Sequence, residues 1–354
     1  MSDLHLGARR EPDVLRRPGP RAALLEAVAG CGRVVLLGDL VELRHNPVRR
    51  VLAEAEPVLR ELGSALGAEG EVLVVPGNHD HLLLRGWLAR RALTDGRPPL
   101  GLETEVDWQV GEPLEQLARW LAPASMRAFY PGVWLGDDVY ATHGHYGDRH
   151  ITVPILERLG AGVMARVVPE PVGGPRTAEE YEATLGPMYA WIDAVAQSGG
   201  VRGRGGGALQ IRAWRTLQRG TGGPRGARLR GLALGAAFPL AVALLNRAGI
   251  GPLRADISYP ALRRGGLEAF TEVLERLGAR PGHAIFGHTH RAGPLPGDPP
   301  GEWRTAQGTA LLNSGCWVAG RSFLAGQPSR SPYRPGFAVL SDGDRPPELV
   351  NLLD

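Results

Sequence analysis

The sequence predicts an α/β fold whose β-strands are covered by helices. Short, wholly apolar strands alternate with helical segments through residues 21–80, and a strand pattern returns near the C-terminal end. Strands without polar alternation are typical of sheets that are buried on both faces, because neither face needs polar side chains. With 354 residues, 43% of them hydrophobic, the chain can build such a core.

Seven apolar runs are expected to be strands, and most of them end at a glycine, a proline or a polar residue. They are residues 34–37, 72–75, 139–142, 284–286, 310–315, 337–340 and 348–350. Residues 81–135 show less regular patterns.

Four segments have helical spacing. They are residues 21–29, about 47–66, 177–197 and 267–277. Asn46 is expected to cap the second helix, with Pro47 in its first turn, and Pro57 is expected to break it. Thr177 and Glu180 form a capping box at the start of the third helix.

The N-terminus places a polar motif almost at the first residue. Residues 2–7 resemble a loop that follows a strand, yet no strand-forming residues precede them. We therefore expect that the natural gene product begins upstream of Met1.

Composition narrows the class of protein. All 40 basic residues are Arg, but the net charge is only +3. GC-rich codons explain much of the Gly, Pro, Ala and Arg content. The number of arginines is therefore weak evidence for nucleic-acid binding. The N-terminal residues lack the basic segment and apolar core of a signal peptide. The longest apolar run, residues 232–245, contains Pro239 and is too short to span a bilayer. Cys31 and Cys316 form no metal-binding pair, so a reduced, cytoplasmic protein is expected.

Polar side chains that can bind a metal follow the expected strands. They are Asp3 and His5, Asp39, Asn78 and His79, His143, and His288 and His290. Loops at strand ends are the usual place for a site in an α/β fold. The first and last of these sets are i, i+2 pairs, which point the same way in extended backbone and can face one metal cluster. None of the ten histidines falls in the long middle section of the chain.

This ordered set resembles the calcineurin-like metallophosphoesterase superfamily, whose motifs are D-x-H, G-D-x-x-[DE], G-N-H-[DE], a later His, and G-H-x-H. Here the motifs stand as Asp3-Leu4-His5, Gly38-Asp39-Leu40-Val41-Glu42, Gly77-Asn78-His79-Asp80, His143-Gly144-His145 and Gly287-His288-Thr289-His290. Each motif alone is weak, but five in the right order are highly specific.

The resemblance implies two packed mixed β-sheets flanked by helices, an α/β/β/α sandwich. Residues 1–150 together with 275–354 would form the catalytic domain. Residues 151–274 would form an inserted helical cap that is rich in Arg and Gly.

The resemblance also implies two metal ions bridged by Asp39. The other ligands of one ion would be Asp3, His5 and His290, and those of the second would be Asn78, His143 and His288. Mixed nitrogen and oxygen ligands suit Mn²⁺, Fe or Zn²⁺ better than Ca²⁺, with Mn²⁺ expected first. Two such ions can activate a bridging hydroxide for in-line attack on phosphorus.

In the same comparison His79 would stabilise or protonate the leaving oxygen, with Asp80 orienting its ring. Glu42 would hold the Asp39 loop from behind the ligands. Asp39 could instead be a simple turn cap, and His145 either extends the site or is exposed to solvent.

The remaining histidines are expected to be loop residues or to contact the ligands from behind. They are His45, His81, His150 and His283. Cys316 is expected to be a small buried residue beside the site.

The middle section bears on the substrate. Ten Arg and no acidic residue lie between positions 202 and 254, around the apolar run 232–245. A basic, apolar cap suits an amphiphilic phosphate ester or an anionic membrane surface, whereas the alternative is a flexible loop with one buried helix.

One branch of the superfamily, the UDP-2,3-diacylglucosamine pyrophosphohydrolases, also places an acyl-binding helical insertion after the His motif. The residues Gly38-Asp39-Leu40-Val41-Glu42 look like the G-D-L-x-E form found in that branch. The chain departs from the branch at His79, where Arg is usual, and at His143-Gly144-His145, where His-Gly-Asp is usual.

We therefore expect a two-metal hydrolase of a phosphate ester or pyrophosphate, acting on a phosphorylated small molecule or a lipid-linked substrate. The alternatives are a nuclease-type phosphodiesterase and a non-catalytic scaffold that keeps the fold. Nucleic acid is not expected as a partner, because the basic section has no interleaved aromatic residue apart from Trp214. Peripheral contact is expected between the cap and the inner face of the membrane.

Overall fold

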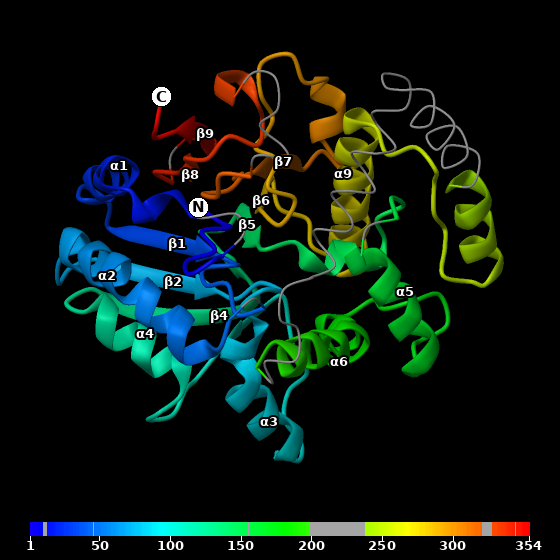
Figure 1. Ribbon diagram of the computed structural model, residues 1–354, viewed down its shortest axis with the longest axis horizontal. Helices are drawn as coiled ribbons and strands as arrows, with labels where there is room; N and C mark the ends of the chain where they lie inside the picture. The colour runs from blue at the N-terminus through cyan, green and yellow to red at the C-terminus, as the bar shows by residue number, and fades with distance from the viewer. Residues whose placement is uncertain (10–12, 45, 155, 198–237, 321–327, 344) are drawn as a thin grey trace, which may run out of the picture.

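The computed structural model describes residues 1–9, 13–44, 46–154, 156–197, 238–320, 328–343 and 345–354, and it shows an α/β fold built on a mixed sheet (Figure 1). The strands of this sheet run in the order β1-β2-β4-β5-β6-β7, with β3 paired to β4, and β8 and β9 form a separate two-stranded sheet. The strands are β1 (Arg33–Leu37), β2 (Glu71–Val75), β3 (Glu103–Glu105), β4 (Ser125–Trp134), β5 (Val139–Thr142), β6 (His283–Phe286), β7 (Ala310–Asn313), β8 (Phe337–Leu340) and β9 (Glu348–Asn351).

The two expected sheets are the halves of this one sheet, and β4 joins them. The start of β4 runs parallel to β2, while its end runs antiparallel to β5, which is followed by β6 and β7 in parallel. Side chains alternate between two apolar layers, as on β2, where Val72 and Val74 face one cluster and Leu73 and Val75 face another. The inner cluster draws on both halves: Leu37, Leu73, Val75, Phe129, Val133, Val139, Ala141, Ile285 and Leu312. The α/β/β/α sandwich is confirmed.

Helices form the two outer layers. In Figure 1, α1 (Pro18–Val28), α2 (Val48–Leu66) and α4 (Pro113–Leu121) lie beside β1, β2 and β4. On the other half, α9 (Tyr259–Arg276) packs against β6, where the ring of Phe270 stacks on Phe286 at 4.1 Å between centroids. The remaining helical segments near the site are η2 (His81–Leu84), α3 (Arg85–Leu93), η3 (His145–Arg149), α5 (Leu156–Val167) and α6 (Ala178–Gln197).

Two expectations about α2 are wrong. The helix passes through Pro57 without a break. One face of α2 is buried along its length and stabilises the helix, whereas Pro57, which has no backbone N–H, lies on the exposed face. Asn46 does not cap the helix. Its side chain instead donates to the carbonyl of Gly7 at 3.1 Å, and the helix begins at Val48.

Helix α9 begins two turns earlier than expected. Ser258 caps it by accepting a hydrogen bond from the N–H of Ala261 at 3.3 Å, and Pro260 follows in the first turn. Leu267 and Leu274 pack into the sheet layer although the sequence placed them in the cap. The division between catalytic domain and cap stays a prediction.

The N-terminal segment lies along β1 and continues beside the loop that follows it. The N–H of Leu37 donates to the carbonyl of Met1 at 2.8 Å, and the N–H of Asp3 donates to the carbonyl of Gly38 at 3.0 Å. A parallel bridge pairs Leu6 with Val41. These contacts place Asp3 and His5 beside Asp39.

Helix α6 is fastened to the catalytic layers by a buried polar network. The expected capping box is confirmed, since Thr177 and Glu180 exchange hydrogen bonds of 3.0 and 3.2 Å. Further along, Glu182 lies 3.0 Å from Nε2 of His81 and accepts a hydrogen bond from the hydroxyl of Tyr130 at 2.7 Å. The Arg-rich section between 202 and 254 and the apolar run 232–245 lie outside the described residues as far as residue 237; from residue 238 both are described, and residues 238–247 are helical. Among the helices that are described, none is long and apolar enough to cross a bilayer.

Replacing Glu182 with Gln is expected to lower the free energy of unfolding by about 1–3 kcal/mol, because His81 and Tyr130 lose a charged acceptor. Burial would raise the pKa of Glu182, but the charge of His81 outweighs it and holds that pKa low, while Glu182 raises the pKa of His81 against burial. The contribution of the pair is therefore full between about pH 4.3 and 6.5, the two unfolded pKa values. It falls on the acid side as Glu182 gains a proton and on the alkaline side as His81 loses one.

Urea unfolding of both proteins across this pH range measures the difference. The control is Glu56→Gln, which removes an exposed carboxylate paired with Arg60 on α2. Equal effects of the two substitutions at every pH would contradict the expectation.

Candidate metal centre

The predicted site residues meet at one edge of the sheet. The loops after β1, β2, β5 and β6 converge there with the N-terminal segment, because the carboxyl ends of parallel strands share an edge. The ligating atoms fall into three overlapping groups, each with all of its atoms within 4.8 Å of one another. The groups are Asp3, His5 and His290; His5, Asp39 and His79; and Asp39, His143 and His288.

The first group surrounds a carboxylate oxygen of Asp3. Oδ1 of Asp3 lies 3.2 Å from Nε2 of His290 and 3.8 Å from Nε2 of His5. The two imidazole nitrogens are themselves 3.1 Å apart. Three potential ligand atoms of one side of the implied centre therefore face a common point.

The third group surrounds a carboxylate oxygen of Asp39. Nε2 of His143 lies 3.3 Å from Oδ2 of Asp39 and 3.2 Å from the amide oxygen of Asn78. The same Oδ2 lies 3.6 Å from Nε2 of His5, which belongs to the first group. Asp39 thus stands between the two sets of ligands that the resemblance implies.

The two carboxylates fit positive ions. Asp3 and Asp39 are buried, and Oδ1 of Asp3 and Oδ2 of Asp39 accept no hydrogen bond from the described residues. Burial alone would raise the pKa of both groups, but the surrounding imidazoles hold both below the usual range. Buried carboxylate oxygens without donors are the expected state of ligands that bind cations, and the mixed donor set suits Mn²⁺, Fe or Zn²⁺. Asp39 is therefore more than a turn cap, although its Oδ1 does accept the N–H of His79 at 2.8 Å.

The backbone of the centre is strained. Within the described part of the chain, the non-glycine residues with positive φ are all candidate ligands: Asp3, His5, Asp39, His288 and His290, with φ of 45–64°. This left-handed conformation is unfavourable for residues with a side chain and is concentrated at functional sites. Gly38 and Gly287 have packing reasons to be glycine, because a Cβ would overlap the ring of His143 at Gly38 and Asp3 at Gly287.

The structure changes the roles expected for Asp80 and Glu42. Asp80 does not orient the ring of His79, because both of its oxygens accept backbone N–H groups, those of Gly77 at 2.6 Å and Leu40 at 2.7 Å. It thereby ties the loop after β2 to the loop after β1. Glu42 orients the ring instead, with Oε2 2.8 Å from Nδ1 of His79.

Glu42 also reaches the first group of ligands. The same Oε2 lies 3.1 Å from Nδ1 of His5, and Oε1 accepts the N–H of Arg44 at 3.0 Å. One buried carboxylate therefore orients both a candidate ligand and the candidate proton donor, and it does so directly rather than through the Asp39 loop.

The other histidines lie around the centre or away from it. His145 is buried rather than exposed, with its ring 5.6 Å from that of His143 and Nε2 3.2 Å from the hydroxyl of Tyr130. His150 and His283 pair with Tyr181 and Asp138 away from the ligands, and His45 lies outside the described residues. Cys316 is buried, as expected.

Sequence reasoning missed Asp148. Its Oδ1 lies 2.7 Å from Nε2 of the candidate ligand His288. No local pattern marks this residue, since it follows the His143 motif by five positions on η3.

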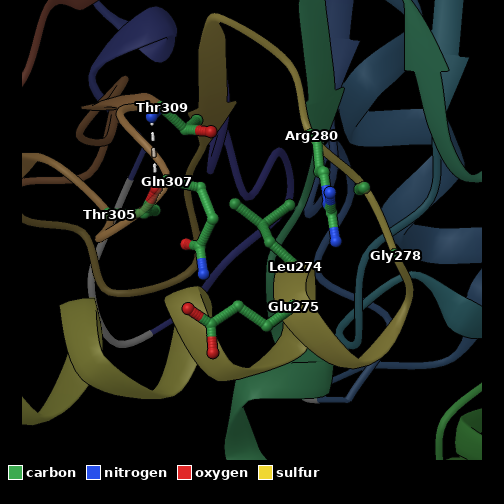
Figure 2. Close-up of a pocket in the computed structure, with 8 residues that line it drawn as sticks. Leu274, Glu275, Gly278, Arg280, Thr305, Gln307 and Thr309 are labelled. Atoms are coloured by element: carbon green, nitrogen blue, oxygen red, sulfur yellow. Dashed lines mark hydrogen bonds between the residues drawn. The ribbon is translucent and has the colours of Figure 1, made fainter.

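Two hollows on the surface do not coincide with the centre. One, of about 100 Å³, lies between the end of α9 and a turn in which the N–H of Thr309 donates to Thr305 (Figure 2). A larger one, of about 340 Å³, lies beside η3 and contains Arg149 and Arg276, which are already paired with Glu170 and Glu272. Neither is lined by a candidate ligand, so these two hollows do not mark the site.

Comparison with known proteins agrees with the motifs. Residues 1–171 match the family described as calcineurin-like phosphoesterase, which confirms the expected superfamily and favours no branch of it. The matched segment contains the strand-end residues from Asp3 to His143, and the structure brings His288 and His290 to the same place from outside it. No curated protein matches the chain.

Replacing Glu42 with Gln is expected to weaken the binding of one metal ion about 10–100-fold, because the ring of His5 loses the charge that fixes it. Calorimetric titration of the metal-free protein with Mn²⁺ measures this. Glu54→Gln, which removes a partly exposed carboxylate paired with Arg50 on α2, is the control and should bind as wild type does. Wild-type affinity in Glu42→Gln would contradict the assigned role.

Proposed function

We propose that this chain, which carries a calcineurin-like phosphoesterase domain, hydrolyses a phosphate ester or pyrophosphate of an amphiphilic molecule at a two-metal centre. The premise is that the chain is a metal-dependent phosphoesterase. The observation that carries the two-metal part is the pair of buried carboxylate oxygens, on Asp3 and Asp39, that have no donor among the described residues. Each lies among imidazoles, and His5 belongs to a group with either carboxylate.

The residues present suit two divalent ions, and Mn²⁺ is the proposed metal. Asp3, His5 and His290 would hold one ion, Asn78, His143 and His288 would hold the other, and Asp39 would serve both. When bound, the ions supply Lewis acidity and an activated water. The burial of Asp3, Asp39, Asn78 and His143 would strengthen their electrostatic interactions with bound ions.

We infer that His79 handles the proton of the leaving group. Its side chain is 21% exposed, whereas Glu42 behind it is buried and lies next to Nδ1. A carboxylate only accepts hydrogen bonds, so Nδ1 carries the proton and Nε2 of the neutral ring presents a lone pair. The ring would take a proton at Nε2 from solvent water and pass it to the leaving oxygen. Burial lowers the pKa of His79 to about 4, against the charge of Glu42, so the charged ring gives up its proton readily.

The apolar surface of the cap supports an amphiphilic substrate. The helical stretch 238–247 exposes Leu240 and Leu244 to 62% and 59%, and α5 exposes Val163 and Val167. The two helices are neighbours, since Arg166 donates to the carbonyl of Ala248 at 2.5 Å. Exposed apolar side chains on adjacent helices suit an acyl chain or peripheral contact with a membrane.

With Mn²⁺ the wild-type protein is expected to hydrolyse p-nitrophenyl phosphate, and Asp39→Asn is expected to lower kcat more than about 100-fold, because both groups of ligands share this carboxylate. Asp107→Asn, at an exposed carboxylate on the surface, is the control and should remain active. The proposal fails if the wild type shows no turnover with Mn²⁺, Fe²⁺ or Zn²⁺, or if Asp39→Asn is fully active.

The amphiphilic part is tested with dodecyl phosphate and ethyl phosphate, which share a reacting group. Wild type is expected to show at least about 10-fold higher kcat/KM for the dodecyl ester, because burying each CH₂ contributes about 0.8 kcal/mol. The double variant Leu240→Glu/Leu244→Glu should lose this preference and keep its activity on ethyl phosphate.

Leu93→Glu is the matched control, since Leu93 is an exposed leucine on α3. It should retain the preference. Equal kcat/KM of the wild type for the two esters would refute the amphiphilic substrate without touching the phosphoesterase chemistry.

A further inference from the structure

Asp148 is a buried carboxylate that the reaction scheme above does not use. It lies on η3, is almost fully buried, and its Oδ1 is 2.7 Å from Nε2 of His288. Its other oxygen, Oδ2, is buried and accepts no hydrogen bond from the described residues. The ring of His288 is therefore the hydrogen-bonding partner that the structure gives this carboxylate.

The main chain and the ring of His288 are each held by a carboxylate. The backbone N–H of His288 donates to Oδ2 of Asp3 at 3.0 Å, and its φ of 64° is in the left-handed region. This fixes where the side chain starts. The contact with Asp148 then fixes how the ring is turned.

The other candidate ligands show what a second contact of this kind does. Nε2 of His5 and Nε2 of His143 face Asp39, and in each ring the opposite nitrogen, Nδ1, is held by an oxygen. The oxygen belongs to Glu42 for His5, at 3.1 Å, and to the carbonyl of Leu37 for His143, also at 3.1 Å. A metal-binding imidazole typically donates its other N–H in this way, which sets its tautomer.

His288 follows the same pattern with its nitrogens exchanged. Asp148 engages Nε2, so the nitrogen left for the group formed with Asp39 and His143 is Nδ1. A carboxylate accepts and does not donate, so the proton of the neutral ring is on Nε2 and the lone pair is on Nδ1.

We propose that Asp148 is a positioning residue of the centre: it accepts the Nε2–H of His288 and turns the Nδ1 lone pair toward the second metal ion. The assignment rests on the proposed two-metal function. It makes Asp148 act through His288, and it separates His288 from His5 and His143, which present Nε2.

Nuclear magnetic resonance of protein labelled with nitrogen-15 histidine and loaded with Zn²⁺ tests the tautomer directly. The expected spectrum shows His288 bound through Nδ1 with a proton on Nε2, and His5 and His143 bound through Nε2. Binding of Zn²⁺ through Nε2 of His288 would overturn the proposal, and this readout needs no substitution that could unfold the protein.

Calorimetric titration with Mn²⁺ tests the consequence. Asp148→Ala is expected to weaken one of the two binding steps about 10–100-fold and to leave the other unchanged. Asp148→Asn keeps an accepting oxygen, so its affinity in the weakened step should fall between those of Asp148→Ala and the wild type. The control is Asp193→Asn, at a buried carboxylate on α6 whose oxygens accept no hydrogen bond from the described residues. Its affinities should be those of the wild type.

The opposite outcome has a distinct signature. If Asp148 merely competes with the metal for His288, Asp148→Ala binds Mn²⁺ more tightly than the wild type, and this result overturns the proposal. An unchanged affinity of Asp148→Ala for Mn²⁺ overturns it as well. A wild-type protein that binds two ions but hydrolyses no phosphate ester would refute the proposed function and leave the assignment of Asp148 standing.

Discussion

The structure depends on two buried carboxylate oxygens that accept no hydrogen bond from the described residues. Asp3 and Asp39 are buried, and each leaves one oxygen without a hydrogen bond from the described residues. A buried charge in that condition is costly unless opposite charge is near. The N-terminal segment and the loops after β2, β5 and β6 supply imidazoles around the two oxygens, and Glu42 and Asp148 hold two of those imidazoles from behind. The arrangement of the loops, and with it the order of the strands, serves this one requirement.

Strain and packing are divided between different parts of the molecule. The positive φ angles of non-glycine residues in the described chain all fall on candidate ligands, whereas the strands that lead to them are regular and apolar. Apolar side chains from both halves of the sheet form the inner cluster, and α2 and α9 cover the outer faces. Conformations that cost energy at the strand ends persist because such a core over-determines the positions of the strands.

The strand ends could be read from the sequence because their signals are local: an apolar run, a glycine, then a polar side chain. The sandwich and the convergence of the candidate ligands follow from those signals and the family resemblance. The contacts behind the ligands could not be read in this way. The family resemblance implies that Asp80 orients the ring of His79, yet Asp80 accepts hydrogen bonds from backbone N–H groups, and Glu42, 37 residues from His79 in the chain, holds the ring. Likewise 140 residues separate Asp148 from His288, and 101 separate Glu182 from His81, so no local pattern links either pair.

The attachment of residues 1–6 sets the order in which the protein can be assembled. The hydroxyl of Ser2 donates to the carbonyl of Gly315, a contact that closes a loop of 313 residues, and the N–H of His288 reaches back to Asp3. Such contacts of high sequence separation form late, because the loop-closure entropy is lost before they stabilise anything. During synthesis the early half-sheet of β1, β2 and β4 can form while Asp3 still lacks its later partners. The centre is therefore completed only when the segment around residues 287–317 has left the ribosome.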